Sequence, residues 1–260
     1  MTDLVTGTLA DGVATITLNR PEGHNAMSWG LVDAFSTVAQ RLAGDPGTRV
    51  FLLRAEGKNF CVGGDIRAFA DEADPSDFLR RLAGRLHEGL KFLFDHPAPL
   101  VVAAQGASAG AGLSLVAGGD VVLAGRSSNF SMAYTGIGLT ADGGATWLLP
   151  RVIGLRRTQE LAYLGRRLNA EEAADYGLVT RIVDDAALAD EAQAVAAKIA
   201  AGPTAAYGGV KRLLAASYGA DFAAHLDAEA EAIATAMASA DAAEGLAAFL
   251  GRRPPVFAGR

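Results

Sequence analysis

The hydrophobic positions of this chain change their spacing along the sequence, and each change predicts a different element. Residues 13–18 alternate between apolar and polar and follow Asp11-Gly12, a pair typical of hairpin turns, so they predict a β-strand. Residues 31–42 place apolar side chains at Leu31, Phe35, Val38 and Leu42. That spacing predicts an amphipathic helix, and the preceding serine can cap it.

Three continuous apolar runs predict strands that are covered on both faces, as in parallel sheets: 50–53, 100–104 and 121–124. Glycine-rich loops and helical stretches separate these runs, so the chain reads as repeated strand–loop–helix units. After Pro203 it is Ala-rich and helical as far as Phe249. We therefore predict an α/β fold, with a core domain over residues 1–200 and a helical region over residues 201–260.

Composition and charge exclude several classes of protein. Half of the 260 residues are hydrophobic, and 23 basic against 29 acidic residues give a net charge of -6, which argues against nucleic acid as a partner. The single cysteine excludes a disulfide framework, and the scattered histidines form no metal-ligand pattern, so we expect no metal. The sequence shows neither a signal peptide nor an apolar run of bilayer width. We therefore expect no contact with a membrane and a cytoplasmic location.

Two glycine-rich loops, residues 59–66 and 105–112, are candidates for chemistry. Each follows a buried strand and leads into a helix. The first amides of a helix have no partner within the helix, so they can hold an anion or a carbonyl oxygen that becomes an oxyanion. The structural alternative is that glycine only permits tight turns here.

The second loop contains Gly106-Ala107-Ser108-Ala109-Gly110, which has the form of the nucleophile elbow of α/β-hydrolases. Asp142 and His225 follow in the order that such a triad requires. However, His225 lies in an Ala-rich helical segment, whereas a hydrolase normally carries this histidine on a loop. A Ser108 esterase is therefore a secondary hypothesis.

Together with the segment 130–151, these motifs resemble those of the crotonase family, also called the enoyl-CoA hydratase/isomerase family. The resemblance extends over nearly the whole chain in the expected order. It implies a spiral of ββα units with a C-terminal helical region that drives trimerisation, often into a dimer of trimers. The motifs that carry it are Asn19-Arg20-Pro21 with Asn25-Ala26-Met27, Phe60 to Ile66, the Gly106 to Gly112 loop with Gly119-Asp120, Gly138-Leu139 through Leu149-Pro150-Arg151, and Phe249 to Pro254.

The same resemblance implies an acyl-CoA thioester as the substrate, with coenzyme A as part of that substrate and no separate cofactor. The thioester oxygen would lie between the backbone N–H groups of Gly64 and Ala111, which stabilise an enolate-like intermediate. The positions implied to contact the substrate or its coenzyme A are Val62, Gly64, Asp65, Ile66, Arg67 and Gly110.

The positions that correspond to acids and bases in the family distinguish one reaction from another. The two glutamates of the hydratases fall on Ser114 and Tyr134, and neither is a carboxylate. Asp142 instead matches an acid found in the dienoyl-CoA isomerases and in the ring isomerases of phenylacetate degradation. One carboxylate can remove a proton at one carbon and return it at another, which is all that a double-bond shift requires. The structural alternative is that Asp142 caps a helix that begins at Gly143.

The leading hypothesis is therefore an acyl-CoA isomerase that shifts a double bond or rearranges an unsaturated ring thioester, with Asp142 as proton shuttle. The alternatives are an enoyl-CoA hydratase of the same fold, the Ser108 esterase, and a binder of CoA thioesters without chemistry. We expect a homotrimer or a dimer of trimers.

Overall fold

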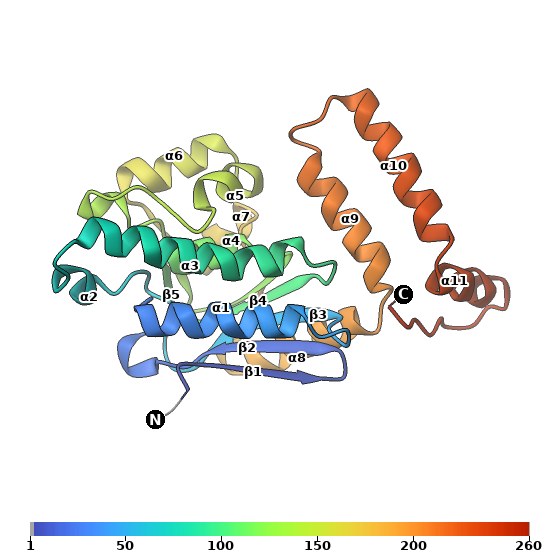
Figure 1. Cartoon of the computed structure of the whole chain (residues 1–260), viewed down its shortest axis with the longest axis horizontal. Helices are drawn as coiled ribbons and strands as arrows, with labels where there is room; N and C mark the ends of the chain where they lie inside the picture. The colour runs from blue at the N-terminus through green and yellow to red at the C-terminus, as the bar shows by residue number, and fades with distance from the viewer. Residues whose placement is uncertain (1–2, 260) are drawn as a thin grey trace.

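The computed structural model describes residues 3–259, and its centre is a six-stranded sheet (Figure 1). The Asp11-Gly12 turn joins the first two strands as an antiparallel hairpin, and every other neighbouring pair in this sheet is parallel. The predicted hairpin and buried strands are thus confirmed. In sheet order the strands are β1 (Val5–Ala10), β2 (Val13–Leu18), β3 (Val50–Ala55), β4 (Leu100–Ala104), β6 (Val121–Gly125) and β9 (Arg181–Val183).

Helices follow most of the strands, as the alternating pattern predicted. The α-helices are α1 (Trp29–Ala43), α2 (Ile66–Ala70), α3 (Pro75–Asp95), α4 (Ala111–Ala117), α5 (Ala145–Val152), α6 (Leu155–Leu164), α7 (Ala170–Asp175), α8 (Leu188–Ala200), α9 (Thr204–Ala216), α10 (Phe222–Met237) and α11 (Ala240–Leu250). Three short 3-10 helices are η1 (Pro21–Gly23), η2 (Thr135–Ile137) and η3 (Asp185–Ala187). Ser28 caps α1 by accepting a hydrogen bond from the Leu31 amide, as expected.

The main sheet is buried on both faces because side chains alternate along each strand. On β3, Phe51 and Leu53 belong to one hydrophobic core, and Val50 and Leu52 belong to the other. Residues of α1 and α3 complete the first core, and one face of α8 completes the second. This two-sided burial explains why these strands appear as continuous apolar runs in the sequence.

A second, three-stranded sheet carries part of the candidate site. Its strands are β5 (Ala107–Ala109), β7 (Asn129–Ser131) and β8 (Arg167–Asn169), in that order. The sequence had predicted only a glycine-rich turn at β5, and that expectation is wrong. The segment is extended because Ser108 pairs with Cys61 of the other glycine-rich loop as well as with β7.

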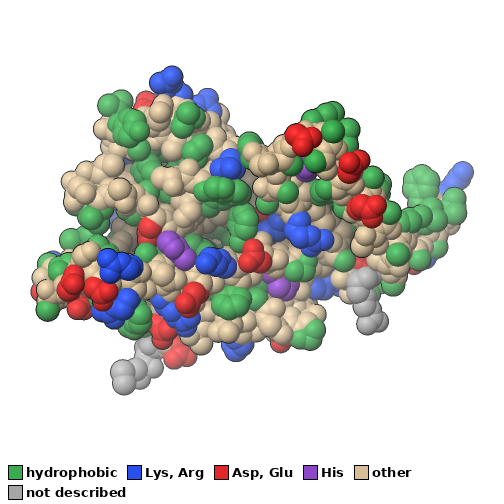
Figure 2. All heavy atoms as spheres, turned by 45° about the horizontal axis from the view of Figure 1, so that its top comes forward, with side chains coloured by type: hydrophobic (Ala, Val, Ile, Leu, Met, Phe, Trp, Pro, Cys, Tyr) green, Lys and Arg blue, Asp and Glu red, His purple; other side chains and the backbone are tan. Residues whose placement is uncertain are grey.

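The last three helices lie beside the rest of the molecule in Figure 1. The Lys211 ammonium ties α9 to the core by donating to the carbonyl oxygens of Leu93 and Ala98, at 3.0 and 3.3 Å. By contrast, α10 has no buried residue, and Figure 2 shows hydrophobic side chains on this part of the surface, at the right. The helical character predicted after Pro203 is confirmed.

Within residues 3–259, no single helix is long and apolar enough to cross a bilayer. The pair α10 and α11, which bend at 77°, passes that test together by length and composition only.

Candidate active site

The two glycine-rich loops lie side by side, and small residues are needed where they meet. The Ala109 amide donates to the carbonyl oxygen of Cys61 at 2.9 Å. A Cβ atom on Gly112 would overlap that same oxygen, and one on Gly63 would lie 3.0 Å from the Ala109 oxygen. The glycines are therefore required for the close approach of the two backbones, and not only for tight turns.

This approach places Gly64 and Ala111, whose amides are the two predicted donors, in the wall of one pocket with a volume of about 500 Å³. Gly64 lies beside Met27 in a short parallel bridge. Its two hydrogen bonds run from the Met27 amide to the Gly63 carbonyl oxygen and from the Asp65 amide to the Met27 carbonyl oxygen, so the bridge does not use the Gly64 amide. Ala111 is the first residue of α4. Among residues 3–259, neither amide has a hydrogen-bond acceptor. Two free N–H groups in one pocket can hold an oxyanion.

Most of the predicted site residues lie around this pocket, but two do not. Asp65 and Arg67 are absent from its lining. Arg67 is exposed, and the Asp65 carboxylate is engaged elsewhere. The predicted residues that line the pocket are Val62, Gly64, Ile66, Gly110, Ala111 and Asp142.

The Asp65 carboxylate holds the first loop in place. It accepts a hydrogen bond from the Arg20 guanidinium at 2.7 Å and another from the Ala68 amide at 3.4 Å, which caps α2. The hydrogen bond from Arg20 is the largest cause that lowers the pKa of Asp65 below its ordinary value. Asp65 is thus an ion-pair partner that supports the neighbouring Gly64.

Asp142 does not cap a helix, so that structural alternative is wrong. Helix α5 begins at Ala145, and its N-cap is Gly144, which has no side chain to form a cap. Both Gly143 and Gly144 have positive φ, at 61° and 84°, and this turn delays the start of the helix. The half-buried Asp142 side chain instead lines the pocket and accepts a hydrogen bond from the Tyr134 hydroxyl at 2.6 Å.

Ser114 and Tyr134 are the residues whose role sequence reasoning did not identify. The Ser114 hydroxyl lies 3.0 Å from the Tyr134 hydroxyl and donates to the Asp142 carbonyl oxygen at 2.9 Å. The signal was present in the sequence, because hydroxyl side chains occupy both positions that correspond to hydratase glutamates. Only the structure shows that both hydroxyls contact Asp142.

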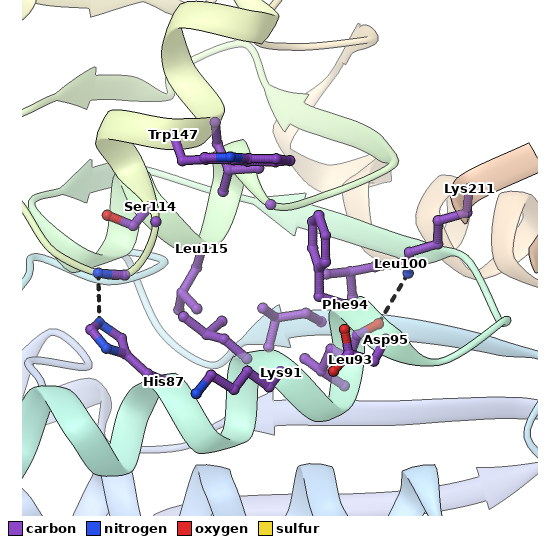
Figure 3. Close-up of a pocket in the computed structure, with 16 residues that line it drawn as sticks. His87, Lys91, Leu93, Phe94, Asp95, Leu100, Ser114, Leu115, Trp147 and Lys211 are labelled. Atoms are coloured by element: carbon purple, nitrogen blue, oxygen red, sulfur yellow. Dashed lines mark hydrogen bonds between the residues drawn. The ribbon is translucent and has the colours of Figure 1, made fainter. Parts of the chain in front are cut away.

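A second pocket, of about 410 Å³, lies on the other side of Ser114 and Gly143 (Figure 3). Its lining is mainly apolar and includes Phe94 and Trp147, whose rings meet edge to face with centroids 5.7 Å apart. The Gly143 amide donates to Nε2 of His87 at 3.1 Å, which ties the turn after Asp142 to α3. Asp142 lines the first pocket and Gly143, the next residue, lines the second, so the two pockets adjoin at this turn.

The structure does not support the esterase hypothesis. Ser108 is buried inside β5, whereas the nucleophile elbow requires a strand-to-helix turn. In the described part of the chain, its hydroxyl has no hydrogen-bond partner. His225 lies in α10, where it contacts Glu229 at 3.6 Å. Cys61 is fully buried, and this burial raises the pKa of its thiol to about 12, which disfavours the thiolate that a nucleophile needs.

The chain is similar to known proteins over nearly its whole length. A family model described as enoyl-CoA hydratase/isomerase matches residues 8–260. The chain is 37% identical over 262 residues, and 100% of both chains, to the 1,2-epoxyphenylacetyl-CoA isomerase of Escherichia coli (strain K12). It is also 37% identical, over 97% of its length and 96% of the relative, to a protein named "Probable enoyl-CoA hydratase" from Rhodobacter capsulatus. The solved structure of an enoyl-CoA hydratase from Bacillus anthracis gives a TM-score of 0.92 at 29% identity, over 99% of this chain and 100% of that one.

Proposed function

This chain belongs to the enoyl-CoA hydratase/isomerase family, also called the crotonase family, and we propose that it is an acyl-CoA isomerase with Asp142 as its only acid–base group. The main support for this proposal is the set of side chains that line the pocket. Among the described residues that line the pocket with the two free amides, Asp142 is the only carboxylate. A hydratase reaction is served by two carboxylates, and the positions that match them hold Ser114 and Tyr134.

The proposed reaction needs only groups that lie in this pocket. Asp142 takes a proton from the carbon next to the thioester carbonyl, and the electron pair of that C–H bond moves onto the thioester oxygen. The amides of Gly64 and Ala111 donate to this oxygen while it is negatively charged. Asp142 then returns the proton two carbons further along, and the double bond moves by one position. Atoms and charge balance without a metal or a redox cofactor, and coenzyme A remains attached to the acyl group.

The name of the relative from Escherichia coli supports one form of the substrate, an unsaturated ring attached to the thioester. The aromatic and aliphatic side chains of the second pocket provide apolar surface close to Asp142, which suits a hydrophobic acyl group. We propose a CoA thioester with an unsaturated chain or ring as the substrate class.

The test is a panel of 2-enoyl-, 3-enoyl-, dienoyl- and oxepin-type CoA thioesters, with the products separated by chromatography. We expect a shifted double bond or a rearranged ring. Formation of 3-hydroxyacyl-CoA as the main product would instead support the hydratase, whose name several relatives carry.

The Asp142→Asn variant tests the residue itself. An amide keeps the size of the side chain but cannot take the proton, so isomerisation should fall about a hundredfold or more. KM should change little because the amides of the oxyanion site are untouched. The control is Ser108→Ala, which alters a buried hydroxyl that has no hydrogen-bond partner among the described residues and should leave the rate nearly unchanged. Full activity in Asp142→Asn would refute the single-acid mechanism.

A further inference from the structure

The Tyr134 side chain holds the carboxylate of Asp142 but has no role in the proton transfer proposed above. The Tyr134 hydroxyl lies 2.6 Å from Oδ1 of Asp142 and 3.0 Å from the Ser114 hydroxyl. Tyr134 is the N-cap residue of the short helix η2 and directly follows Ala133, whose φ of 51° is unusual for a residue with a side chain. The backbone thus adopts a costly conformation just before the residue that reaches Asp142.

Tyr134 is a hydrogen-bond donor here and not a second base. Burial is the largest cause that raises the pKa of Tyr134 well above its ordinary value, and the neighbouring Asp142 charge adds to the effect. The phenol therefore keeps its proton at neutral pH. Its one proton is directed to Oδ1, and the Ser114 hydroxyl lies within hydrogen-bonding distance of the phenol oxygen.

The other carboxylate oxygen remains available. Within residues 3–259, Oδ2 of Asp142 has no hydrogen-bond donor, and no cation forms an ion pair with this carboxylate. The backbone around it is fixed from two sides. The Ser114 hydroxyl donates to the Asp142 carbonyl oxygen, and the Gly143 amide donates to His87, the bond drawn as a dashed line from His87 in Figure 3. With the backbone fixed, the Asp142 carboxylate can move only by rotation of its side chain, and the hydrogen bond from Tyr134 restricts that rotation.

We infer that Tyr134 is a positioning residue, which fixes Oδ1 of Asp142 so that Oδ2 is the oxygen that removes and returns the proton. This inference rests on the proposed isomerase function. One oxygen must reach two carbons of the acyl chain in turn, so a carboxylate that rotates freely would spend much of its time misaligned. A small misplacement of a catalytic group can cost up to about a hundredfold in rate.

The test combines kinetics with a measurement that needs no turnover. In Tyr134→Phe we expect kcat to fall about tenfold or more while KM stays within about twofold, because only the alignment of the base changes. The matched control is Tyr163→Phe, since Tyr163 is 76% exposed and lies on α6, and this variant should keep the wild-type rate.

The contact itself is measured by nuclear magnetic resonance with tyrosine labelled at the ring carbon that bears the hydroxyl. The chain has only five tyrosines, so the signal that disappears in Tyr134→Phe identifies Tyr134. We expect this signal to shift in Asp142→Asn, whereas the signal of Tyr163 should not move. A Tyr134 signal that is the same in wild type and in Asp142→Asn would refute the contact.

The kinetic measurements test the positioning role of Tyr134 separately from the proposed isomerase function. An unchanged kcat in Tyr134→Phe, with Asp142→Asn inactive, would overturn the positioning role even if the melting temperature fell. If the wild-type enzyme hydrates its substrates instead, the proposed function fails, but a tenfold loss of the hydration rate in Tyr134→Phe would still support the positioning of Asp142.

Discussion

At the scale of single residues, the candidate site uses backbone groups as much as side chains. The proposed oxyanion donors are the amides of Gly64 and Ala111, and their side chains contribute no polar atom. Replacing Ala111 by most residues would therefore leave its N–H in place. Proline is the exception because it has no N–H, and it is tolerated at the first position of a helix, which Ala111 occupies.

We predict that Ala111→Pro lowers the isomerisation rate about a hundredfold or more, the usual cost of losing one oxyanion donor. The product coenzyme A thioester should still bind, which calorimetry can measure. Ala111→Gly is the control, because it keeps the amide and should retain most of the activity. A correctly folded Ala111→Pro protein with the wild-type rate would show that the second donor lies elsewhere.

At the scale of elements, the first glycine-rich loop depends on polar contacts from the segment after β2. Asn25 is fully buried and donates to the carbonyl oxygens of Glu56 and Asn59, at 3.0 and 2.9 Å. The pair of Arg20 and Asp65 adds a charged contact at 2.7 Å and joins this segment to α2. These contacts hold the backbone on both sides of Gly64, so the geometry of the proposed oxyanion site depends on them.

The ion pair predicts a pH dependence of stability. Arg20 lowers the pKa of Asp65, so the pair stabilises the folded protein above the ordinary value of 3.8, and this contribution is lost as pH falls through the lowered value. At pH 7, Asp65→Asn should reduce the free energy of unfolding by about 1–2 kcal/mol. Near pH 3 the difference from wild type should become smaller.

Urea unfolding at fixed protein concentration measures this difference at both pH values. The control is Asp71→Asn, because Asp71 is exposed and has no ion-pair partner in the described part of the chain. A difference between Asp65→Asn and wild type that stays constant from pH 7 to pH 3 would argue against the ion pair as its source.

At the scale of the whole molecule, the C-terminal helices present apolar side chains that no other segment within residues 3–259 covers. The exposed fractions are 73% for Ile233, 80% for Phe249 and 74% for Leu250. Large exposed apolar surfaces mark interaction sites, because water contact with them is unfavourable. The resemblance to the family implies that this region joins subunits.

We predict that the protein forms a trimer or a hexamer, so light scattering at micromolar concentration should give three or six times the mass of one chain. The double variant Ile233→Glu/Phe249→Glu should lower that mass, because burying a charge at a subunit contact is costly. Circular dichroism should show that the variant keeps its helices. A wild-type protein that stays monomeric under these conditions would contradict the prediction.

Much of the fold and part of the site could be predicted from the sequence. The β1–β2 hairpin, the buried strands and the capped helix α1 follow from local patterns, because alternation, apolar runs and capping residues act over a few positions. The short strands β5, β7 and β8 could not be predicted, since each has only three residues and exists because of its neighbours.

The sequence by itself determined which chemical groups are available: two glycine-rich loops, one aspartate at position 142, and hydroxyls where two carboxylates would serve hydration. The tertiary structure alone decided how they are combined. It showed that Asp142 faces Tyr134 and does not cap a helix, that Asp65 pairs with Arg20 outside the pocket, and that Ser108 is buried in a strand. The physical reason is range: hydrogen bonds and ion pairs between distant segments depend on how the chain packs, and no local pattern encodes them.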